Sequence, residues 1–434
     1  MKTLAIIGTG IAGLGAAHFL QRNYEITLFE ADDHVGGHAN TVEISEDGQR
    51  RQVDTGFMVF NQVTYPHLIR LFQQLSVAIK PTDMSFSVQH RGRGLEYCGS
   101  SLSLLFGQRR NLIKPSFYRL LMQINRFNSE AVDLLDTPAI EEMTLGEFVR
   151  HRGYGEDFLH LYLIPMGSAV WSTDTERMLQ FPAGTLLRFF HNHGFLGLHT
   201  QHPWWTVEGG SQQYVEKLIA PFRKRIHLRT PVHRVRRFAG SVEVTTSTST
   251  QRFDKAIFAC HPPTALKILG NEATPLERRL LTAFSYQPNG ATLHRDERVM
   301  PARRRVWSSW NQRIDPIASS TPSEPQAAYE SSTHYWMNRL QGVSPRTNYF
   351  VSINGERLID PGSIIKKIDY EHPLFDLPAR KAQQEVPELN WQATSTTETY
   401  FVGAWQRYGF HEDGLGSAVN LSAQLLGRDH WLPQ

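Results

Sequence analysis

Three glycines and one acidic residue near the N-terminus have the types and the spacing that bind a dinucleotide. Gly8, Gly10 and Gly13 form the pattern GxGxxG, and Glu30 follows about twenty residues later. Gly8 permits a tight turn, Gly10 lets the backbone approach a pyrophosphate, and Gly13 lets a helix pack closely on a strand. The carboxylate of Glu30 would accept hydrogen bonds from ribose hydroxyls.

These residues need a strand before the glycines and a helix after them. Thr3–Gly8 is short and apolar, which predicts a buried parallel strand that ends at the glycine. Apolar residues then recur at helical spacing up to Leu20, and a second predicted strand, 25–29, leads into Glu30. The helix N-terminus would face the phosphates with free N–H groups and the positive end of its dipole. The predicted contacts also include Ile11, Ala12 and Ala31.

Further segments continue this pattern along the whole chain. They are EADDHVGGHANTV with Gly36 and Gly37, VDTGF at 53–57, WTVEGGSQQYVEKL at 205–218, YFVGAW at 400–405 and GFHEDGLGSAV at 409–419. Together they resemble the flavin amine oxidase superfamily, which includes monoamine and polyamine oxidases, protoporphyrinogen oxidase and phytoene-type desaturases. The resemblance implies FAD as the cofactor. It also implies that FAD is held non-covalently, because no cysteine follows Cys260 in the region where monoamine oxidases tether it.

The resemblance implies roles for residues in these segments. The second glycine pair would run along the pyrophosphate and ribityl chain, and His38 stands where the family usually has arginine, so a donor remains without a permanent charge. The residue that matches Val232 meets the adenine through its backbone. The segment with Thr55, Gly56 and Phe57 would pass near the isoalloxazine, or else form a simple loop after a strand.

The C-terminal segment would place a helix N-terminus at the flavin N1–C2=O edge, where N–H groups and the helix dipole stabilise reduced flavin. Ala404 replaces the acid that usually reaches the ribityl chain. The flavin contacts expected from this segment are Gly403, Ala404, His411, Asp413, Gly414 and Leu415.

Four residues are candidates for the chemistry itself. Trp405 and His411 lie inside the last flavin motif and are expected to face the ring. His411 or Glu412 would serve as a proton acceptor or ligand anchor; the alternative is that this acidic stretch only caps the helix through Asp413. Many amine oxidases of the family hold a water near N5 with a lysine. The matching stretch at 286–296 has no lysine, and Asn289 is nearest in place.

The predicted fold is α/β, with a Rossmann-type FAD-binding domain and an inserted substrate domain of helices and strands. The FAD-binding domain is expected to comprise 1–64, 203–265 and 391–434, and the substrate domain 65–202 and 266–390. Within the insertions, apolar periodicity predicts helices at Tyr65–Leu75, Ser116–Leu135 and Thr144–Arg152, and strands at Ala291–His294, Val306–Trp310 and Tyr349–Ile353.

A narrower resemblance concerns the substrate. The segments VGGHANTV, VDTGFMVFN, SSWNQR, THYWMNRLQ, EHPLFD and GFHEDGL resemble a bacterial subgroup of NAD/FAD-binding proteins associated with cyclopropane-fatty-acid-synthase-like methyltransferases. Relatives desaturate methylated fatty-acyl chains. This implies hydride transfer from a lipid acyl chain to flavin N5, with a lipid methyltransferase as a partner. The alternatives are an amine or amino-acid oxidase, an FAD-dependent lipid isomerase, and a non-enzymatic flavin-binding partner of a methyltransferase.

Composition and charge bound these expectations. The 434 residues carry a net charge of +3, and no nucleic-acid module accompanies the basic runs, so nucleic acid is not an expected partner. Two cysteines suit a reducing cytoplasm, and no Cys/His spacing indicates a metal. No uncharged run approaches the ~20 residues of a membrane span. Ser101–Leu121 interleaves apolar residues with Arg109, Arg110, Lys114 and Arg119. It could lie on an anionic bilayer at the inner face of the membrane, or pack as an ordinary amphipathic helix.

Overall fold

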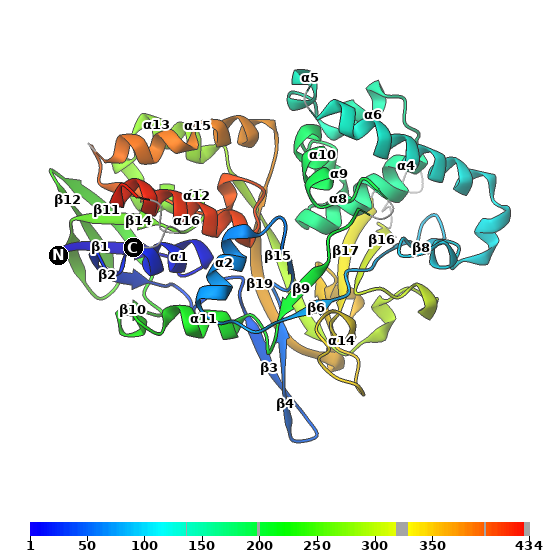
Figure 1. The fold of residues 1–434 in the computed structure, drawn as a ribbon, viewed down its shortest axis with the longest axis horizontal. Coiled ribbons are helices and arrows are strands. Elements are labelled where there is room, and N and C mark those ends of the chain that lie inside the picture. The colour runs from blue at the N-terminus through cyan, green and yellow to red at the C-terminus, as the bar shows by residue number, and fades with distance from the viewer. Residues whose placement is uncertain (136, 198–199, 318–328, 395, 429–434) are drawn as a thin grey trace.

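The computed structural model describes residues 1–135, 137–197, 200–317, 329–394 and 396–428, and it has two lobes (Figure 1). The first lobe is built on a parallel five-stranded sheet in the order β10-β2-β1-β14-β20. Its strands are β1 (Lys2–Ile7), β2 (Tyr24–Phe29), β10 (Ile226–His227), β14 (Lys255–Phe258) and β20 (Thr399–Phe401). The mixed α/β class and the first two predicted strands are confirmed.

Alternate residues of β1 point into two different layers. Leu4 and Ile6 pack on one face with α1 (Ile11–Leu20), α11 (Gln212–Ile219) and α16 (His411–Leu426). Ala5 and Ile7 pack on the other face. The elements of that second layer are the antiparallel strands β11 (Val232–Phe238), β12 (Ser241–Thr246) and β13 (Thr250–Phe253) and the helices α12 (Pro262–Leu269), α13 (Pro275–Thr282) and α15 (Leu377–Ala393).

The packing of α13 and α15 bears on the domain boundaries. Leu280 of α13 and Val386 of α15 share one apolar cluster with Ala5 of β1, and Figure 1 shows both helices over the first lobe. The sequence-based boundaries assigned both helices to the inserted domain. In the structure α15 packs against β20, and α13 packs against α12 and α15, so by packing both helices belong to the first lobe.

The second lobe contains a seven-stranded sheet in the order β19-β15-β18-β17-β16-β7-β8, in which β16 and β7 are parallel and the other neighbours antiparallel. The strands are β7 (Phe86–His90), β8 (Leu95–Cys98), β15 (Ser285–His294), β16 (Trp310–Pro316), β17 (Tyr329–Trp336), β18 (Phe350–Ile353) and β19 (Ile364–Leu374), and α14 (Met337–Leu340) follows β17.

A helical layer rich in aromatic side chains covers this sheet. Phe127, Phe158 and Phe190 are fully buried at its centre. The helices are α3 (Leu102–Leu105), α4 (Pro115–Leu134), α5 (Pro138–Glu141), α6 (Leu145–His151), α7 (Glu156–Phe158), α8 (Ile164–Trp171), α9 (Thr175–Met178) and α10 (Ala183–Asn192).

Short elements join the two lobes. A three-stranded sheet in the order β5-β9-β6 and the hairpin β3–β4 lie between them, and α2 packs against α16. Their bounds are β3 (Thr41–Glu46), β4 (Gln49–Asp54), β5 (Phe60–Asn61), α2 (Pro66–Gln74), β6 (Ile79–Thr82) and β9 (Trp204–Val207). In the described ranges, no helix combines the length and the apolar character needed to cross a bilayer.

One local prediction is wrong, and one of the alternatives considered for Ser101–Leu121 does not hold. The strand predicted at Val306–Trp310 begins only at Trp310, because residues Arg304–Val306 form a 3₁₀ turn. A single amphipathic helix through Ser101–Leu121 is not present either, because α3 ends before Gly107 and α4 starts at Pro115. A Cβ at Gly107 would lie 2.4 Å from the Val306 side chain, and a proline ring suits the first turn of a helix but not its interior.

Candidate functional site

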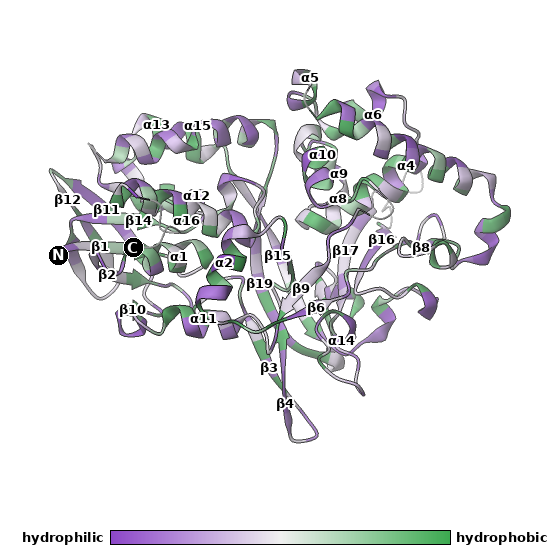
Figure 2. Cartoon of the chain, in the orientation of Figure 1, coloured by the Kyte–Doolittle hydropathy of each residue, from purple (hydrophilic) through white to green (hydrophobic). Residues whose placement is uncertain are grey.

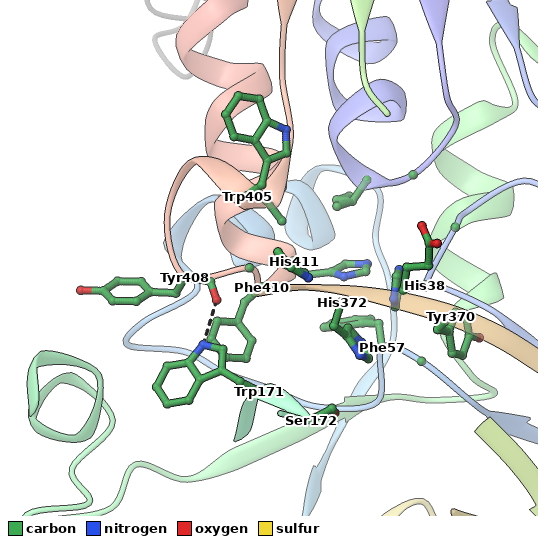
Figure 3. A pocket seen from close by; sticks show the side chains of 18 of the residues that line it. His38, Phe57, Trp171, Ser172, Tyr370, His372, Trp405, Tyr408, Phe410 and His411 are labelled. Carbon is green, nitrogen blue, oxygen red and sulfur yellow. Dashed lines mark hydrogen bonds between the residues drawn. The ribbon is translucent and has the colours of Figure 1, made fainter. Parts of the chain in front are cut away.

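A cavity of about 450 Å³ lies between the lobes and is lined by both (Figure 3). One end is bordered by the glycine turn after β1, and the other by aromatic side chains of the second lobe. Of the site residues predicted from sequence, the lining includes Gly8, Gly10, Ile11, Ala12, Glu30, Gly37, His38, Thr55, Gly56, Phe57, Gly403, Ala404, Trp405 and His411. It does not include Gly13, Ala31, Gly36, Val232, Asn289, Glu412, Asp413, Gly414 or Leu415.

The glycine turn forms an anion cradle at the N-terminus of α1. Gly8 has φ +105°, and a Cβ there would lie 2.7 Å from Ala259 O. A Cβ at Gly13 would lie 2.0 Å from Gly8 O, whereas a Cβ at Gly10 would meet no protein atom within 4 Å. The space beside Gly10 therefore belongs to the cavity. The first backbone hydrogen bond of α1 runs from Leu14 N to Gly10 O, and no acidic residue lies in the first turn of the helix. The preceding N–H groups are thus left for a ligand.

Glu30 is fixed at the rim of this cradle. Its Oε2 accepts hydrogen bonds from Thr9 N (2.9 Å) and Thr9 Oγ (2.5 Å), and its Oε1 accepts one from Asp32 N (3.0 Å). Gly36 N donates to Thr9 O (3.1 Å), which holds the second glycine pair against the first. Each carboxylate oxygen keeps acceptor capacity for ribose hydroxyls.

His38 lines the cavity and has a buried ring nitrogen without a partner in the described part of the chain. Its ring stacks on Tyr370 with 4.6 Å between centroids, and His372 lies 5.2 Å away. Burial holds the pKa of His38 well below its usual value, so the ring is neutral. Its buried Nε2 has no hydrogen-bond partner among the described residues. A buried ring nitrogen without a partner at a cavity wall is costly unless a ligand pairs with it. Together with the empty space at Gly10, it fits a bound dinucleotide.

Asp54 holds the next segment in place. Its carboxylate accepts hydrogen bonds from Ser211 N (2.9 Å), Thr41 Oγ (2.5 Å) and Gln341 Nε2 (2.6 Å). Burial raises the pKa of Asp54 above its usual value. This network fixes the turn that follows, in which residues 55–57 line the cavity. Sequence reasoning did not single out Asp54, because its partners come from distant segments.

The acidic residues at the start of α16 do not face the cavity. Asp413 accepts hydrogen bonds from Phe410 N (2.9 Å) and Tyr408 N (3.2 Å), so helix capping, the alternative role considered for it, is the one observed. Glu412 accepts from His67 N (2.9 Å) and Leu68 N (3.0 Å) and thereby ties α16 to the first turn of α2. Glu412 therefore holds the start of α2 in place and does not line the cavity. Burial raises the pKa of Glu412 to about 7.

His411 and Trp405 point in different directions. The His411 ring stacks on Phe57 with 3.8 Å between centroids, and its Nε2 lies 2.8 Å from Tyr214 Oη. Burial lowers the pKa of His411 to about 3, so this ring is uncharged. Trp405 borders the cavity, but its indole packs on Phe284, 4.7 Å away, within the core of the first lobe. Figure 3 shows it turned away from His411. The expectation that Trp405 faces the reacting centre is therefore not supported.

Asn289 does not line the cavity, but it contacts His372, which does. It is fully buried and contacts Nδ1 of His372, which does line the cavity, at 2.6 Å. With the amide oxygen toward His372, the amide nitrogen donates to Ser172 O (3.1 Å). The His372 hydrogen then lies on Nδ1, which leaves Nε2 as an acceptor. Burial lowers the pKa of His372 to about 4. Sequence reasoning selected Asn289 and missed His372, although it lies in the EHPLFD segment.

The far end of the cavity is aromatic and uncharged. Trp171 Nε1 donates to Tyr408 O (3.1 Å), the bond drawn in Figure 3, and Phe189 stacks on Phe410 at 5.1 Å. Further apolar residues that line this region are Met58, Met84, Phe195, Trp204, Trp310, Tyr335, Leu340 and Ile353. These rings belong to helices and strands far apart in the sequence.

The described lining contains no lysine, arginine or aspartate, and its carboxylates are Glu30 and Glu371. Glu30 is bonded to Thr9, and Glu371 lies 3.1 Å from His261 Nδ1. Within the described residues the lining therefore offers no cationic side chain. Its two carboxylates are held by neutral partners, because the donors to Glu30 are uncharged and burial lowers the pKa of His261 beside Glu371.

Comparison with known proteins adds a family. A model of the family described as flavin containing amine oxidoreductase matches residues 11–407. Among curated proteins, a 1-hydroxycarotenoid 3,4-desaturase from Flavobacterium sp. (strain P99-3) is 42% identical over 76 residues, which are 17% of this chain. The matched segment spans only 14% of that relative's length.

Solved structures match over nearly the whole chain. A variant of putrescine oxidase has a TM-score of 0.66 at 14% identity and covers 98% of this chain and 99% of its own. A fatty acid isomerase from P. acnes that produces CLA has a TM-score of 0.65 at 14% identity, with 98% of each chain covered. At these identities the likeness establishes the fold alone.

Proposed function

Because the chain belongs to the flavin containing amine oxidoreductase family and is an FAD-dependent oxidoreductase, we propose that it dehydrogenates a neutral, hydrophobic chain, such as a fatty-acyl chain of a lipid. The observation that carries this proposal is the aromatic wall of the cavity, formed by Trp171, Phe189, Phe410 and their neighbours, which itself carries no charged side chain. A cationic amine would lose its hydration there and gain no counter-charge.

The histidines of the lining support the same reading. His372 and His411 have pKa values of about 4 and 3, so neither carries charge at neutral pH. His38 is neutral for the same reason, burial. An apolar substrate chain therefore lies against neutral imidazole rings. The wall formed by Trp171, Phe189 and their neighbours offers such a chain an apolar surface.

FAD, when bound, supplies the hydride acceptor of this reaction. The residues of this chain that would hold it are the free N–H groups at the start of α1, the Glu30 carboxylate and the unpaired His38 Nε2. Dehydrogenation removes a hydride and a proton from adjacent carbons of the substrate. His372 is able to accept that proton at Nε2, because its Nδ1–H donates a hydrogen bond to the amide oxygen of Asn289.

Two relatives are consistent with this proposal by name. One is named as a desaturase of a hydroxycarotenoid, and the other as a fatty acid isomerase. Neither match transfers an activity to this chain: the first covers 17% of it and the second shows only the fold.

The test is anaerobic reduction of the bound flavin. Purified holoprotein is mixed without oxygen with a phospholipid extract that contains unsaturated and methylated acyl chains, and in parallel with a panel of amines and amino acids. We expect the flavin absorption band to bleach with the lipid alone, and the recovered acyl chains to have lost two hydrogens. Bleaching by an amine alone would refute the proposal. A lipid whose double bond moves without lasting bleaching would make the protein an isomerase.

A further inference from the structure

The outer surface of the second lobe carries a cluster of exposed apolar and basic side chains around the start of α4. Leu102 is 77% exposed, Ile113 85% and Met122 64%, and Leu112 and Tyr118 are nearly half exposed. We call these five residues, with Arg109, Lys114 and Arg119, the 102–122 surface. Figure 1 places it at the edge of the molecule farthest from the first lobe, and Figure 2 shows hydrophobic and hydrophilic turns side by side there.

The fold itself produces this arrangement. The inner face of α4 is buried through Phe117, Leu120 and Phe127, so Tyr118 and Met122, one helical turn apart, face outward. Ile113 lies at the end of a 3₁₀ turn just before α4. Tyr118 and Met122 also border a shallow surface hollow. Within a soluble protein such a cluster of exposed large apolar residues marks an interaction site.

Charge decides what the surface binds. Residues 97–129 contain no aspartate or glutamate, and they contain the cations Arg109, Arg110, Lys114, Arg119 and Arg126. The flanking carboxylates are paired: Glu96 with Arg303 (3.0 Å) and Glu130 with Arg126 (2.7 Å). Arg109, Lys114 and Arg119 are exposed and form no ion pair with the described residues. The whole chain has a net charge of only +3, so positive charge is concentrated here.

We propose that the 102–122 surface docks the protein on an anionic lipid membrane. The exposed cations would pair with lipid phosphates, and Leu102, Ile113 and Met122 would enter the boundary between headgroups and acyl chains. Exposed aliphatic side chains beside the cations favour a lipid surface over a nucleic acid, which has no apolar phase to receive them. The docking surface is the outside of the same helical layer whose inner side chains Trp171 and Phe189 line the cavity.

The experiment is co-sedimentation of the FAD-loaded protein with vesicles. One set contains phosphatidylcholine alone, and the other contains phosphatidylglycerol in addition. We expect binding to the anionic vesicles only, and weaker binding as salt rises, because the Debye length shrinks to about 8 Å at physiological ionic strength and further above it. The triple variant Arg109→Gln, Lys114→Gln, Arg119→Gln should bind roughly a hundredfold more weakly.

Matched controls use the other lobe, where Lys224, Arg225 and Arg234 are also exposed. Their triple change to glutamine should leave vesicle binding unaltered. Ile113→Ser with Met122→Ser should weaken binding roughly tenfold or more, whereas Ile365→Ser with Trp391→Ser, two exposed apolar residues elsewhere, should not. The flavin spectrum of each variant reports that the fold is kept.

Three outcomes would overturn the proposal. The first is that the protein does not bind anionic vesicles, and the second is that both triple variants lose vesicle binding to the same extent. The third is that this surface mediates dimerisation or RNA binding while the protein does not bind lipid. Vesicle binding does not depend on turnover, so its failure is distinguishable from failure of the proposed dehydrogenation.

Discussion

Gly10→Ala should weaken FAD binding while leaving the apoprotein folded. No protein atom lies within 4 Å of the position that the new Cβ would take, although Gly10 lines the cavity. Its backbone angles, φ −66° and ψ 177°, are open to alanine. The methyl group therefore meets nothing in the protein, and it stands where a pyrophosphate must approach the N-terminus of α1.

The magnitude follows from steric overlap in a packed site. Forcing one extra methyl group into such a site costs about 1 to 3 kcal/mol, which corresponds to a rise of roughly 5- to 150-fold in the Kd for FAD. The free energy of unfolding of the apoprotein should change by less than about 1 kcal/mol, since Gly10 is an N-cap without a capping side chain.

Titration of the apoprotein with FAD, followed by quenching of flavin fluorescence, measures the Kd, and urea unfolding of the apoprotein measures stability. Gly290→Ala is the neutral control, because its Cβ also meets no atom and it lies outside the cavity. Gly13→Ala is the opposite control: its Cβ would lie 2.0 Å from Gly8 O, so the apoprotein itself should lose stability. If Gly10→Ala bound FAD as tightly as the wild type, the assignment of the glycine turn as the pyrophosphate site would be refuted.

Three further predictions concern the same site. Asn289→Leu should slow flavin reduction by the substrate about tenfold at unchanged FAD affinity, because it removes the partner that orients His372; stopped-flow absorbance measures the rate, and a changed Kd instead of a changed rate would contradict it. Glu412→Gln should flatten the pH dependence of unfolding between about pH 4.5 and 7. Burial raises the pKa of Glu412 to about 7, so the folded chain keeps a proton that the unfolded chain loses, and up to about 3 kcal/mol of stability present below pH 4.5 is lost as the pH rises through 7; parallel wild-type and variant profiles would contradict this. Adding FAD at a hundred times its Kd should raise the unfolding free energy of the apoprotein by about 2.7 kcal/mol, measurable by urea denaturation; an unchanged midpoint would argue against specific binding.

The dinucleotide end of the site was predictable because its determinants are local. Gly8, Gly10 and Gly13 act within one strand-turn-helix unit, and Glu30 ends the next strand, so spacing alone places them together. The family resemblance placed the second glycine pair along the cofactor, and the structure holds that pair beside the first through the bond from Gly36 N to Thr9 O.

The substrate end was not predictable in this way. Trp171, Phe189 and Tyr335 meet in one cavity from two helices and a strand, and nothing local distinguishes an aromatic residue that faces a cavity from one in the core. For the same reason Trp405 was expected at the reacting centre and lies in the first-lobe core instead. The strand at 310–316 was misplaced because its residues Asn311, Gln312 and Arg313 are polar and yet buried, against the usual alternation.

The strand order also has a consequence for how the protein is made. β1 is synthesised first, but one of its two neighbours, β14, follows about 250 residues later, and β20, which pairs with β14, lies near the C-terminus. Helix α16, whose first residue His411 lines the cavity, is synthesised later still. The complete cofactor site therefore exists only after β20 and His411 have been synthesised, so the early part of the nascent chain cannot hold FAD by itself. Until then the cell must shield a long chain whose central strand has an unpaired edge.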